Sequence, residues 1–139
     1  MRTSVRVLLV CALLAGVLAA SVEAGPEKPD HLGRFALGDA LAWTWPVAAD
    51  DPLYPPQFSF YRQDGAEWSG LFHGPFDRLG PDLYGYALAL SPYLGFADGE
   101  RYMICGETLV AGEPVYSFWT FAISGRGNRP VKADLTACP

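Results

Sequence analysis

The sequence predicts an all-β protein whose single domain is an antiparallel β-sandwich, preceded by a signal peptide. After residue 25, apolar side chains keep helical spacing for no more than about ten residues at a time, which argues against long helices. Short runs of alternating large and small side chains recur instead, separated by Gly and Pro at intervals of about 8 to 20 residues. No helical crossover separates these runs, so we expect antiparallel rather than parallel strands.

Residues 1–24 have the pattern of a secretory signal peptide. Arg2 and Arg6 precede an uncharged apolar run over residues 7–20, which is shorter than the roughly 20 residues of a membrane-spanning helix. The sequence Val22-Glu23-Ala24 then resembles a cleavage site, so we expect cleavage after Ala24 and a secreted or periplasmic protein. If the segment is retained instead, it anchors the protein in a membrane.

The remaining residues, 25–139, are enough for one domain with an aromatic core. All 19 aromatic residues and all 12 prolines of the chain lie in this part. It carries eight Lys and Arg residues against 14 Asp and Glu residues. This negative balance repels phosphate backbones, so we expect no nucleic acid as partner.

The first elements of the domain follow a charged, Pro-containing leader at residues 25–33, which we expect to be flexible. The sandwich itself is expected over residues 34–124. In the run 41–47, Leu41, Trp43 and Trp45 share one face of a strand. A hairpin then joins the strand of Phe58 and Phe60 to residues 68–72 through Asp64-Gly65, a favoured turn dipeptide.

The later elements show the same alternation. One strand places its bulky side chains on one face and small ones on the other; the bulky ones are Tyr84, Tyr86, Leu88 and Leu90. Tyr102 and Ile104 are expected to face the core from the penultimate strand. A turn at residues 112–114 should join that strand to residues 116–123 in a final hairpin, and residues 125–139 form a C-terminal tail.

Cys105 and Cys138 are the two cysteines that remain after cleavage, and in an oxidising compartment an even count predicts a disulfide bond. Two free thiols or an intermolecular bond are the alternatives. If Tyr102 and Ile104 face the core, Cys105 points to the opposite face. The bond would then hold the tail against the outside of the sheet.

Two segments resemble known immunoglobulin-like modules. Residues 94–104 (LGFADGERYMI) resemble the corner of fibronectin type III and related domains, where a Gly-containing turn precedes a tyrosine of the penultimate strand. Residues 112–121 (GEPVYSFWTF) are similar to the end of the bacterial SbsA-type immunoglobulin-like domain, and residues 41–47 are similar to an early strand of that family. The resemblance implies an immunoglobulin-like β-sandwich, a fold that serves many unrelated functions.

No catalytic, cofactor-binding or metal-ligating set of residues is predicted. The common nucleophile, zinc-protease and phosphate-binding motifs are missing from the sequence. His31 and His73 lie far apart and lack partners at metal-ligand spacing. Asp50-Asp51, and Asp98 with Glu100, are carboxylates of the kind that bind calcium, although turn formation is the simpler interpretation.

Elimination favours a non-catalytic binding or structural role in the cell envelope, with an unknown protein or envelope component as partner and no cofactor. One alternative is a carbohydrate-binding module that uses Tyr54 and Trp68, both expected to be exposed. A second alternative is a small exported hydrolase, for which His73, Asp77 and Asp82 form the most suggestive cluster. A solvated loop explains that cluster equally well.

Overall fold

The computed structural model describes residues 28–123 and 135–139, and within them the regular structure is almost entirely β-strand. A single 3-10 helix, η1 (Pro92–Leu94), interrupts the strands. In chain order, the strands are β1 (Asp30–Phe35), β2 (Ala40–Pro46), β3 (Gln57–Asp64), β4 (Glu67–Pro75), β5 (Asp77–Gly80), β6 (Leu83–Ala89), β7 (Arg101–Val110) and β8 (Glu113–Ile123).

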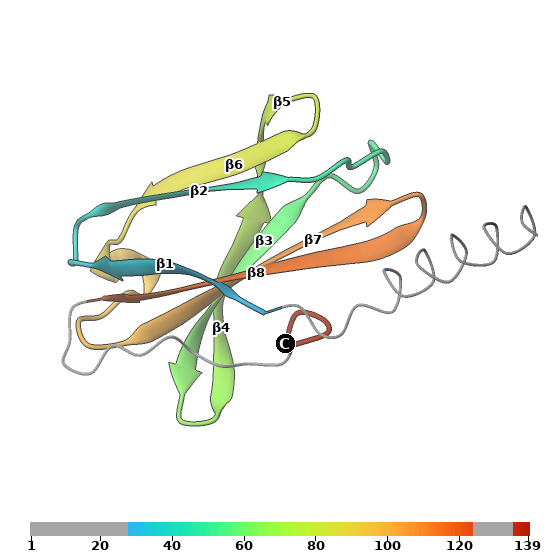
Figure 1. The fold of residues 1–139 in the computed structure, drawn as a ribbon. Helices are drawn as coiled ribbons and strands as arrows, with labels where there is room; N and C mark the ends of the chain where they lie inside the picture. Colours follow the sequence, from blue (N-terminus) through green and yellow to red (C-terminus); the bar gives the residue numbers. More distant parts are fainter. Residues whose placement is uncertain (1–27, 124–134) are drawn as a thin grey trace, which may run out of the picture.

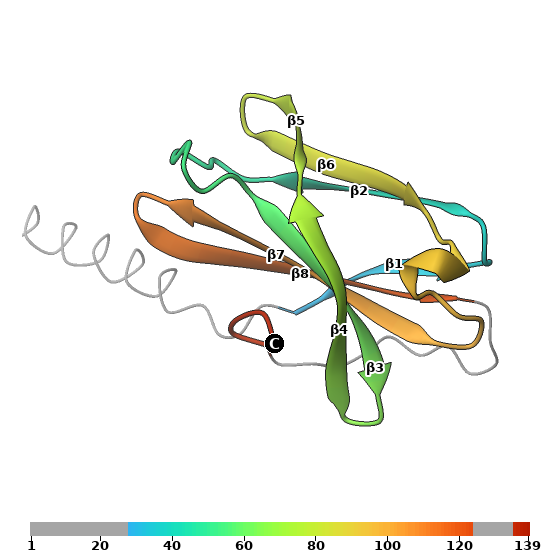
Figure 2. The same ribbon diagram turned by 180° about the vertical axis from the view of Figure 1, so that it is seen from behind.

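The strands form two sheets that pack face to face (Figure 1, and from behind Figure 2). One sheet has the order β1-β8-β7-β3-β4 and the other β2-β6-β5. This is the immunoglobulin-like arrangement: β2, β6 and β5 take the places of strands B, E and D, while β8, β7 and β3 take those of G, F and C, with β4 beside C. The prediction of an immunoglobulin-like β-sandwich is therefore confirmed.

Strand β1 departs from the sequence-based expectation in two ways. It begins at Asp30, inside the segment 25–33 that was expected to be a flexible leader, and it pairs in parallel with β8, whereas the other described strand pairs are antiparallel. The edge of β8 offers backbone partners to any chain laid beside it, and these hydrogen bonds outweigh a composition typical of a loop. The predicted signal peptide, and the tail up to residue 134, lie outside the described residues.

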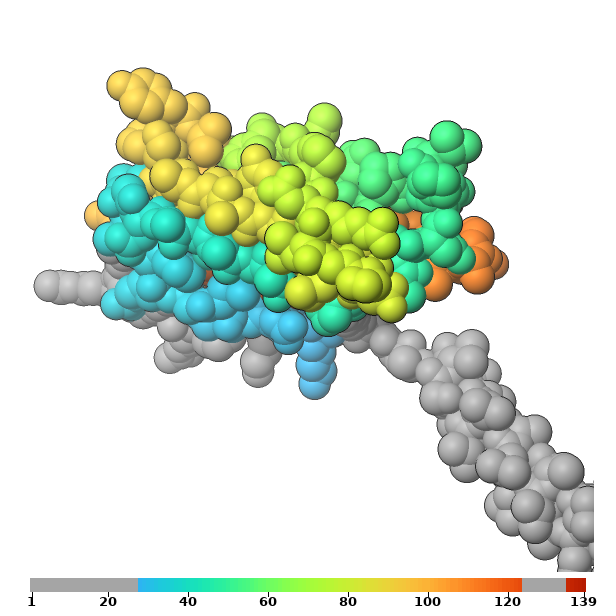
Figure 3. Space-filling model, turned by 90° about the horizontal axis from the view of Figure 1, so that it is seen from above, coloured from blue at the N-terminus to red at the C-terminus, as the bar shows by residue number. Residues whose placement is uncertain are grey.

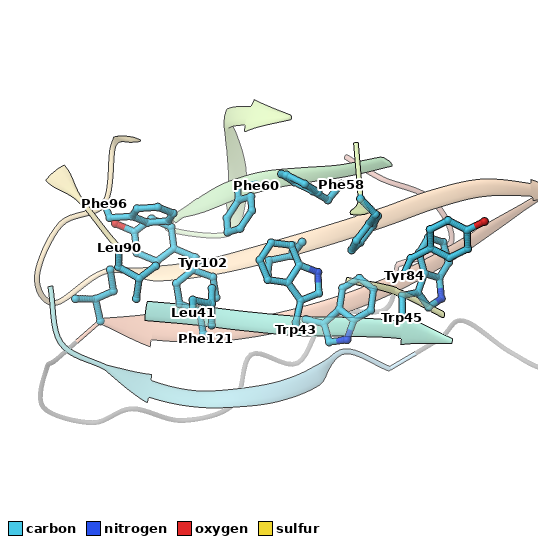
Figure 4. Close-up of a cluster of buried hydrophobic side chains, with 14 of the residues drawn as sticks. Leu41, Trp43, Trp45, Phe58, Phe60, Tyr84, Leu90, Phe96, Tyr102 and Phe121 are labelled. Atoms are coloured by element: carbon cyan, nitrogen blue, oxygen red, sulfur yellow. The ribbon is translucent and has the colours of Figure 1, made fainter. Parts of the chain in front are cut away.

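The core between the sheets is aromatic, as predicted (Figure 4). Trp43 of β2 is only 4% exposed, and its ring meets those of Phe58 and Phe60 edge-on, with centroids 5.4 and 5.3 Å apart. Edge-to-face contacts of this kind add to the stabilisation that burial of the rings provides. Buried residues that the sequence analysis did not assign to the core include Val47, Phe76 and Phe96.

In and just after strand β6, only some of the bulky side chains that were predicted to share one face are fully buried. Tyr84 and Leu90 are buried, but Tyr86 and Leu88 are half-buried and pack against the border of the core. On the face with the small side chains, a Cβ atom on Gly85 would lie 2.7 Å from Cδ1 of Leu79 in β5, whereas Ala87 and Ala89 are exposed.

The corner before β7 has the hydrogen bonding expected from the resemblance of residues 94–104 to fibronectin type III domains. The hydroxyl of Tyr102, a fully buried residue, accepts a hydrogen bond of 2.7 Å from the backbone N–H of Ala97. This is the tyrosine corner of immunoglobulin-like sandwiches. Burial also raises the pKa of the Tyr102 hydroxyl, because it disfavours the phenolate.

A second apolar cluster lies on the outer face of the larger sheet. Met103, Cys105 and Phe118 are buried there, and Cys105 is bonded to Cys138 with 5.7 Å between the Cα atoms. The predicted disulfide bond and its place on the outer face are both confirmed. Leu135 also packs against this cluster, so the bond holds residues 135–139 over side chains that would otherwise face water.

Both predicted hairpins form, although one turn lies elsewhere than expected. The β3–β4 hairpin turns at residues 65–66, where Gly65 has a φ of 64°. The β7–β8 hairpin turns at Ala111 and Gly112, with φ values of 51° and 78°, and not at residues 112–114. Positive φ at both central positions gives a turn twist that matches the twist of the strands, so the ladder continues through Glu113 and Pro114.

Candidate functional site: a groove at one end of the sandwich

Three connections come together at one end of the sandwich: the β2–β3 loop (residues 47–56), the β5–β6 turn (81–82) and the β7–β8 turn (111–112) (Figure 1). The backbone N–H of Val47 donates to the carbonyl of Asp82 at 3.1 Å. The backbone N–H of Ala111 donates to both carboxylate oxygens of Asp50, at 3.0 and 3.2 Å. These bonds tie the long loop 47–56 to the other two connections.

The loop 47–56 is also fixed internally. The carboxylate of Asp51 accepts a 2.9 Å hydrogen bond from the N–H of Leu53, and its carbonyl accepts a 3.1 Å bond from the N–H of Tyr54. The hydroxyl of Thr108 in β7 donates to the carbonyl of Tyr54 at 3.2 Å. Asp50 and Asp51 therefore act as turn-forming residues, as the simpler sequence interpretation held.

This fixed loop forms one wall of a groove of about 390 Å³, and the β7–β8 hairpin forms the other. Figure 3 shows the loop beside the tip of that hairpin, at the end of the molecule opposite to η1. The groove is lined by Leu53, Tyr54, Pro55, Gln57, Glu107, Thr108, Leu109 and Pro114. Leu53 is 82% exposed and Tyr54 59% exposed, so two large apolar side chains face solvent beside a concave surface.

A second depression, of about 520 Å³, lies over β3 and β4 where a bulge at Phe60 and Tyr61 shifts the register. Ser59 and His73 pair across the two strands there. It is larger but more open, and its tyrosine is already engaged, because the Tyr61 hydroxyl donates to the carbonyl of Pro139 at 3.2 Å. The smaller groove is more enclosed and is lined by the exposed side chains of Leu53 and Tyr54, so it is the stronger candidate.

The two aromatic residues proposed as a sugar platform are not brought together. Tyr54 lies in the groove as an exposed ring, in line with its expected exposure. Trp68 was expected to be exposed, but it is half-buried and packs on the outer-face cluster with Met103, Cys105 and Phe118. The exposure of Trp68 was wrongly predicted because its place in the sequence, beside a hairpin turn, does not show that Leu135 and Cys138 pack on the same outer face of the sheet.

The candidate metal and catalytic residues occupy separate places. His73 lies in β4, Asp77 begins β5 and Asp82 lies in the β5–β6 turn, all exposed. Within residues 28–123 and 135–139, no three His, Cys, Asp or Glu side chains are placed to hold a metal ion. The ring nitrogen Nδ1 of His31 lies 3.1 Å from the hydroxyl of Thr120, across the β1–β8 pair.

Most of the groove was missed by the sequence analysis, which had singled out only Tyr54. Leu53 adjoins Tyr54 in a Pro-rich loop, and that neighbourhood was the one available signal. Glu107, Leu109 and Pro114 come from β7 and β8, about 55 residues later, and only the pairing of the strands places them opposite the loop.

No family model and no curated protein matches this chain. Among solved structures, an uncharacterized protein from Bacillus anthracis is 13% identical, with a TM-score of 0.49, over 70% of this chain and 85% of that one. A chicken T-cell receptor is 7% identical, with a TM-score of 0.39, over 73% of this chain and 50% of that one.

A third solved structure, CD84 of the SLAM family, is 12% identical, with a TM-score of 0.33, over 70% of this chain and 99% of that one. Likenesses this distant carry no functional argument, so a role has to be derived from the groove itself. In the part of the chain that the structure describes, no helix is long and apolar enough to cross a membrane.

Proposed function

We propose that this protein is an exported, non-catalytic binding module of the cell envelope, and that it recognises a protein partner through the groove between loop 47–56 and the β7–β8 hairpin. The observation that carries the proposal is the exposure of Leu53 and Tyr54 on a loop held in place by hydrogen bonds. Large apolar side chains seldom face water on a fixed concave surface unless they bind something.

The energetics favour this site as a binding surface. Burying a side chain such as Leu53 against a partner contributes about 1.5 to 3 kcal/mol, and Tyr54 contributes a comparable amount. The bonds from Asp51 and Thr108 already order the loop in the unbound protein. Binding therefore requires little further loss of conformational entropy, which is the usual advantage of a preorganised site.

Export is supported by two separate features. Residues 1–24 have the signal-peptide pattern, and Cys105 is bonded to Cys138. Disulfide bonds of this kind persist in oxidising compartments and are rare in the cytosol. Intact-mass measurement of the protein from its native host tests the cleavage: we expect a chain that starts at Gly25, and a mass that includes residues 1–24 would mean a retained anchor.

Binding by the groove is tested with a double variant, Leu53→Ser/Tyr54→Ala. Saturable binding of the labelled, purified protein to envelope fractions of its host is measured, and we expect the double variant to bind at least about tenfold more weakly. Tyr93→Ala is the matched control, because Tyr93 is 99% exposed on η1 at the opposite end. Equal binding by wild type and the double variant would place the binding surface elsewhere.

Treating the envelope fraction beforehand separates the partner classes. Protease treatment should abolish the binding of the wild-type protein if the partner is a protein. Binding that survives protease but is removed by glycosidases would instead favour the carbohydrate-binding alternative.

A further inference from the structure

Strand β2 is an edge of the smaller sheet, because among the described strands it pairs with β6 and with no other. Figure 1 shows β1 beyond it in the other layer of the sandwich. Just before β2, the N–H of Leu90 donates to the carbonyl of Asp39 at 2.8 Å. Just after it, the N–H of Val47 donates to the carbonyl of Asp82 at 3.1 Å. Hydrogen-bonded pairs alternate along an antiparallel ladder, so the odd-numbered residues of β2 point their backbone groups toward β6.

The even-numbered residues of β2 point their backbone groups away from the sheet. In the described part of the chain, the N–H groups of Ala40, Ala42 and Thr44 have no hydrogen-bond partner. Pro46 occupies the next position of this kind, where the ladder does not need the N–H that proline lacks. All of these residues are exposed, so this edge is open to another strand.

Strand β2 also lacks the features that protect the other edges of the two sheets. Strand β1 carries charged side chains and a bulge between His31 and Gly33. Strand β4 has a register shift in its pairing with β3 and ends at Pro75, and β5 is four residues long. Charges, bulges, prolines and short length are the usual means by which proteins keep edge strands from associating. In contrast, β2 is seven residues long, contains no charged residue and pairs with β6 without a register shift.

We infer that two copies of this protein associate through their β2 edges, antiparallel to each other, and so join the two smaller sheets into one continuous sheet. With the two-fold axis at Ala42, Ala40 of each copy lies opposite Thr44 of the other, and Ala42 lies opposite Ala42. Each of these residues has a free N–H and a free carbonyl on that side, so each pair exchanges two hydrogen bonds. The edge is therefore complementary to itself, as the interface of a symmetric dimer must be.

The charges of the protein favour a second copy as the occupant of this edge. The formal net charge is -5 at pH 7, so two copies repel each other least where the contact surface is uncharged. The outward side chains of β2 are Ala, Thr and Pro, so no like charges face one another across the new pairing. The residues ahead of β1 are poor alternative occupants, because Pro26 and Pro29 lack N–H donors. A single strand pair buries less than the roughly 1,200 Å² of a stable interface, so we expect a dimer that dissociates in the micromolar range.

The test is sedimentation velocity of the purified protein, with its disulfide bond intact, over about a hundredfold range of concentration. We expect the wild-type protein to change from monomer to dimer over this range. Ala42→Lys and Ala42→Glu each bring like charges together across the joined strands, so each should raise the dissociation constant of the dimer about three- to tenfold. An equimolar mixture of the two variants should restore association, because Lys then faces Glu.

The matched control is Ala87→Lys. Ala87 lies opposite Ala42 in β6 and is exposed on the same face of the sheet. The control therefore adds the same charge one strand away from the joint, and it should leave the dissociation constant unchanged. Thermal unfolding of each variant checks that it is folded.

Hydrogen exchange locates the interface within the dimer. The amide protons of Ala40, Ala42 and Thr44 should exchange rapidly in dilute protein and more slowly in concentrated protein. A protein that stays monomeric at all concentrations would overturn the inference, and so would a dimer that Ala42→Lys and Ala87→Lys weaken equally. Slow exchange of these amides in the monomer would also overturn it, since another part of the chain would then cover the edge. None of these results bears on the proposed function, because no residue that lines the groove belongs to β2.

Discussion

Gly106 of β7 is the position where one added methyl group should disturb the core most directly. It pairs with Phe58 of β3 and Ser117 of β8, and it lies beneath two tryptophan rings. A Cβ atom built there would be 3.0 Å from Cζ3 of Trp119 and from both Cε3 and Cζ3 of Trp45. Both indoles are 5% exposed, so neither ring has room to retreat.

The expected effect of Gly106→Ala is a net loss of stability. Overpacking a filled core costs about 1 to 3 kcal/mol, and replacing a strand glycine by alanine recovers about 0.5 to 1 kcal/mol of backbone entropy. The free energy of unfolding should therefore fall by about 1 to 2 kcal/mol. For a domain of this size, that lowers Tm by about 4 to 10 °C.

Gly70→Ala is the matched control in β4. Its Cβ atom would lie 3.8 Å from Cε1 of Tyr61, an ordinary contact, so Tm should stay unchanged or rise slightly. Both variants are compared with wild type by thermal and urea unfolding. The penalty of Gly106→Ala should also shrink in a Trp45→Phe background, because phenylalanine lacks the outer ring of the indole. If Gly106→Ala is as stable as Gly70→Ala, the close approach of the two tryptophans to β7 is wrong.

Three further predictions concern the corner, a turn and the tail. Tyr102→Phe should lower the free energy of unfolding by about 1 kcal/mol, because the hydrogen bond to Ala97 is lost. The folded-state pKa of Tyr102 is raised, so its contribution to stability is present below the unfolded pKa of about 10 and is lost as the pH rises above that value. Urea unfolding between about pH 8 and 11 should therefore show a steeper loss of stability for wild type than for the variant. Ala111→Asn should raise the urea midpoint by the equivalent of about 0.5 to 1 kcal/mol, since asparagine tolerates positive φ better, and an unchanged midpoint would contradict the strain assigned to this turn. Replacing Cys105 and Cys138 by alanine should lower the free energy of unfolding by about 3 to 4 kcal/mol. After mild reduction of the wild-type protein, hydrogen exchange should rise first at residues 135–139 while the strands stay protected. Mass mapping that finds both thiols free in the native protein would refute a structural role for the disulfide bond.

The strands with one buried face were predictable because their signal is local. Leu41, Trp43 and Trp45 alternate with small or polar residues, and that alternation alone determines which side chains point inward. The disulfide bond was predictable because only two cysteines follow the predicted cleavage site. The face of the sheet on which it lies followed from the alternation of side chains along the strand, since Cys105 is an odd number of residues from the inward-facing Tyr102. The strand β1 carried no such alternation, because a bulge between His31 and Gly33 interrupts the period of two between Leu32 and Phe35, which both pack against the core. Its residues 30–33 were therefore taken for part of a leader.

For the groove too, the sequence predicted a local feature and missed the features that depend on tertiary contacts. The sequence identified Tyr54 as an exposed aromatic residue in a Pro-rich loop, which is a local property. It did not identify Glu107 or Pro114, because their position opposite the loop depends on the pairing of β3 with β7 and of β7 with β8. Nor did it show that Thr108 and Ala111 fix the loop, since those hydrogen bonds join residues more than 50 positions apart.

By itself, then, the sequence determined the class of fold, the inward faces of β2, β3 and β7, the partners in the disulfide bond and the net negative charge. Each depends on residue type, periodicity or count, which are properties of the chain before it folds. Only the tertiary structure decided that β1 runs beside β8, that Trp68 and Leu135 pack against the same outer-face cluster, and that Leu53 and Tyr54 face a second wall formed by β7 and β8. These features depend on which distant backbones come into contact, and the close packing of the core selects those contacts.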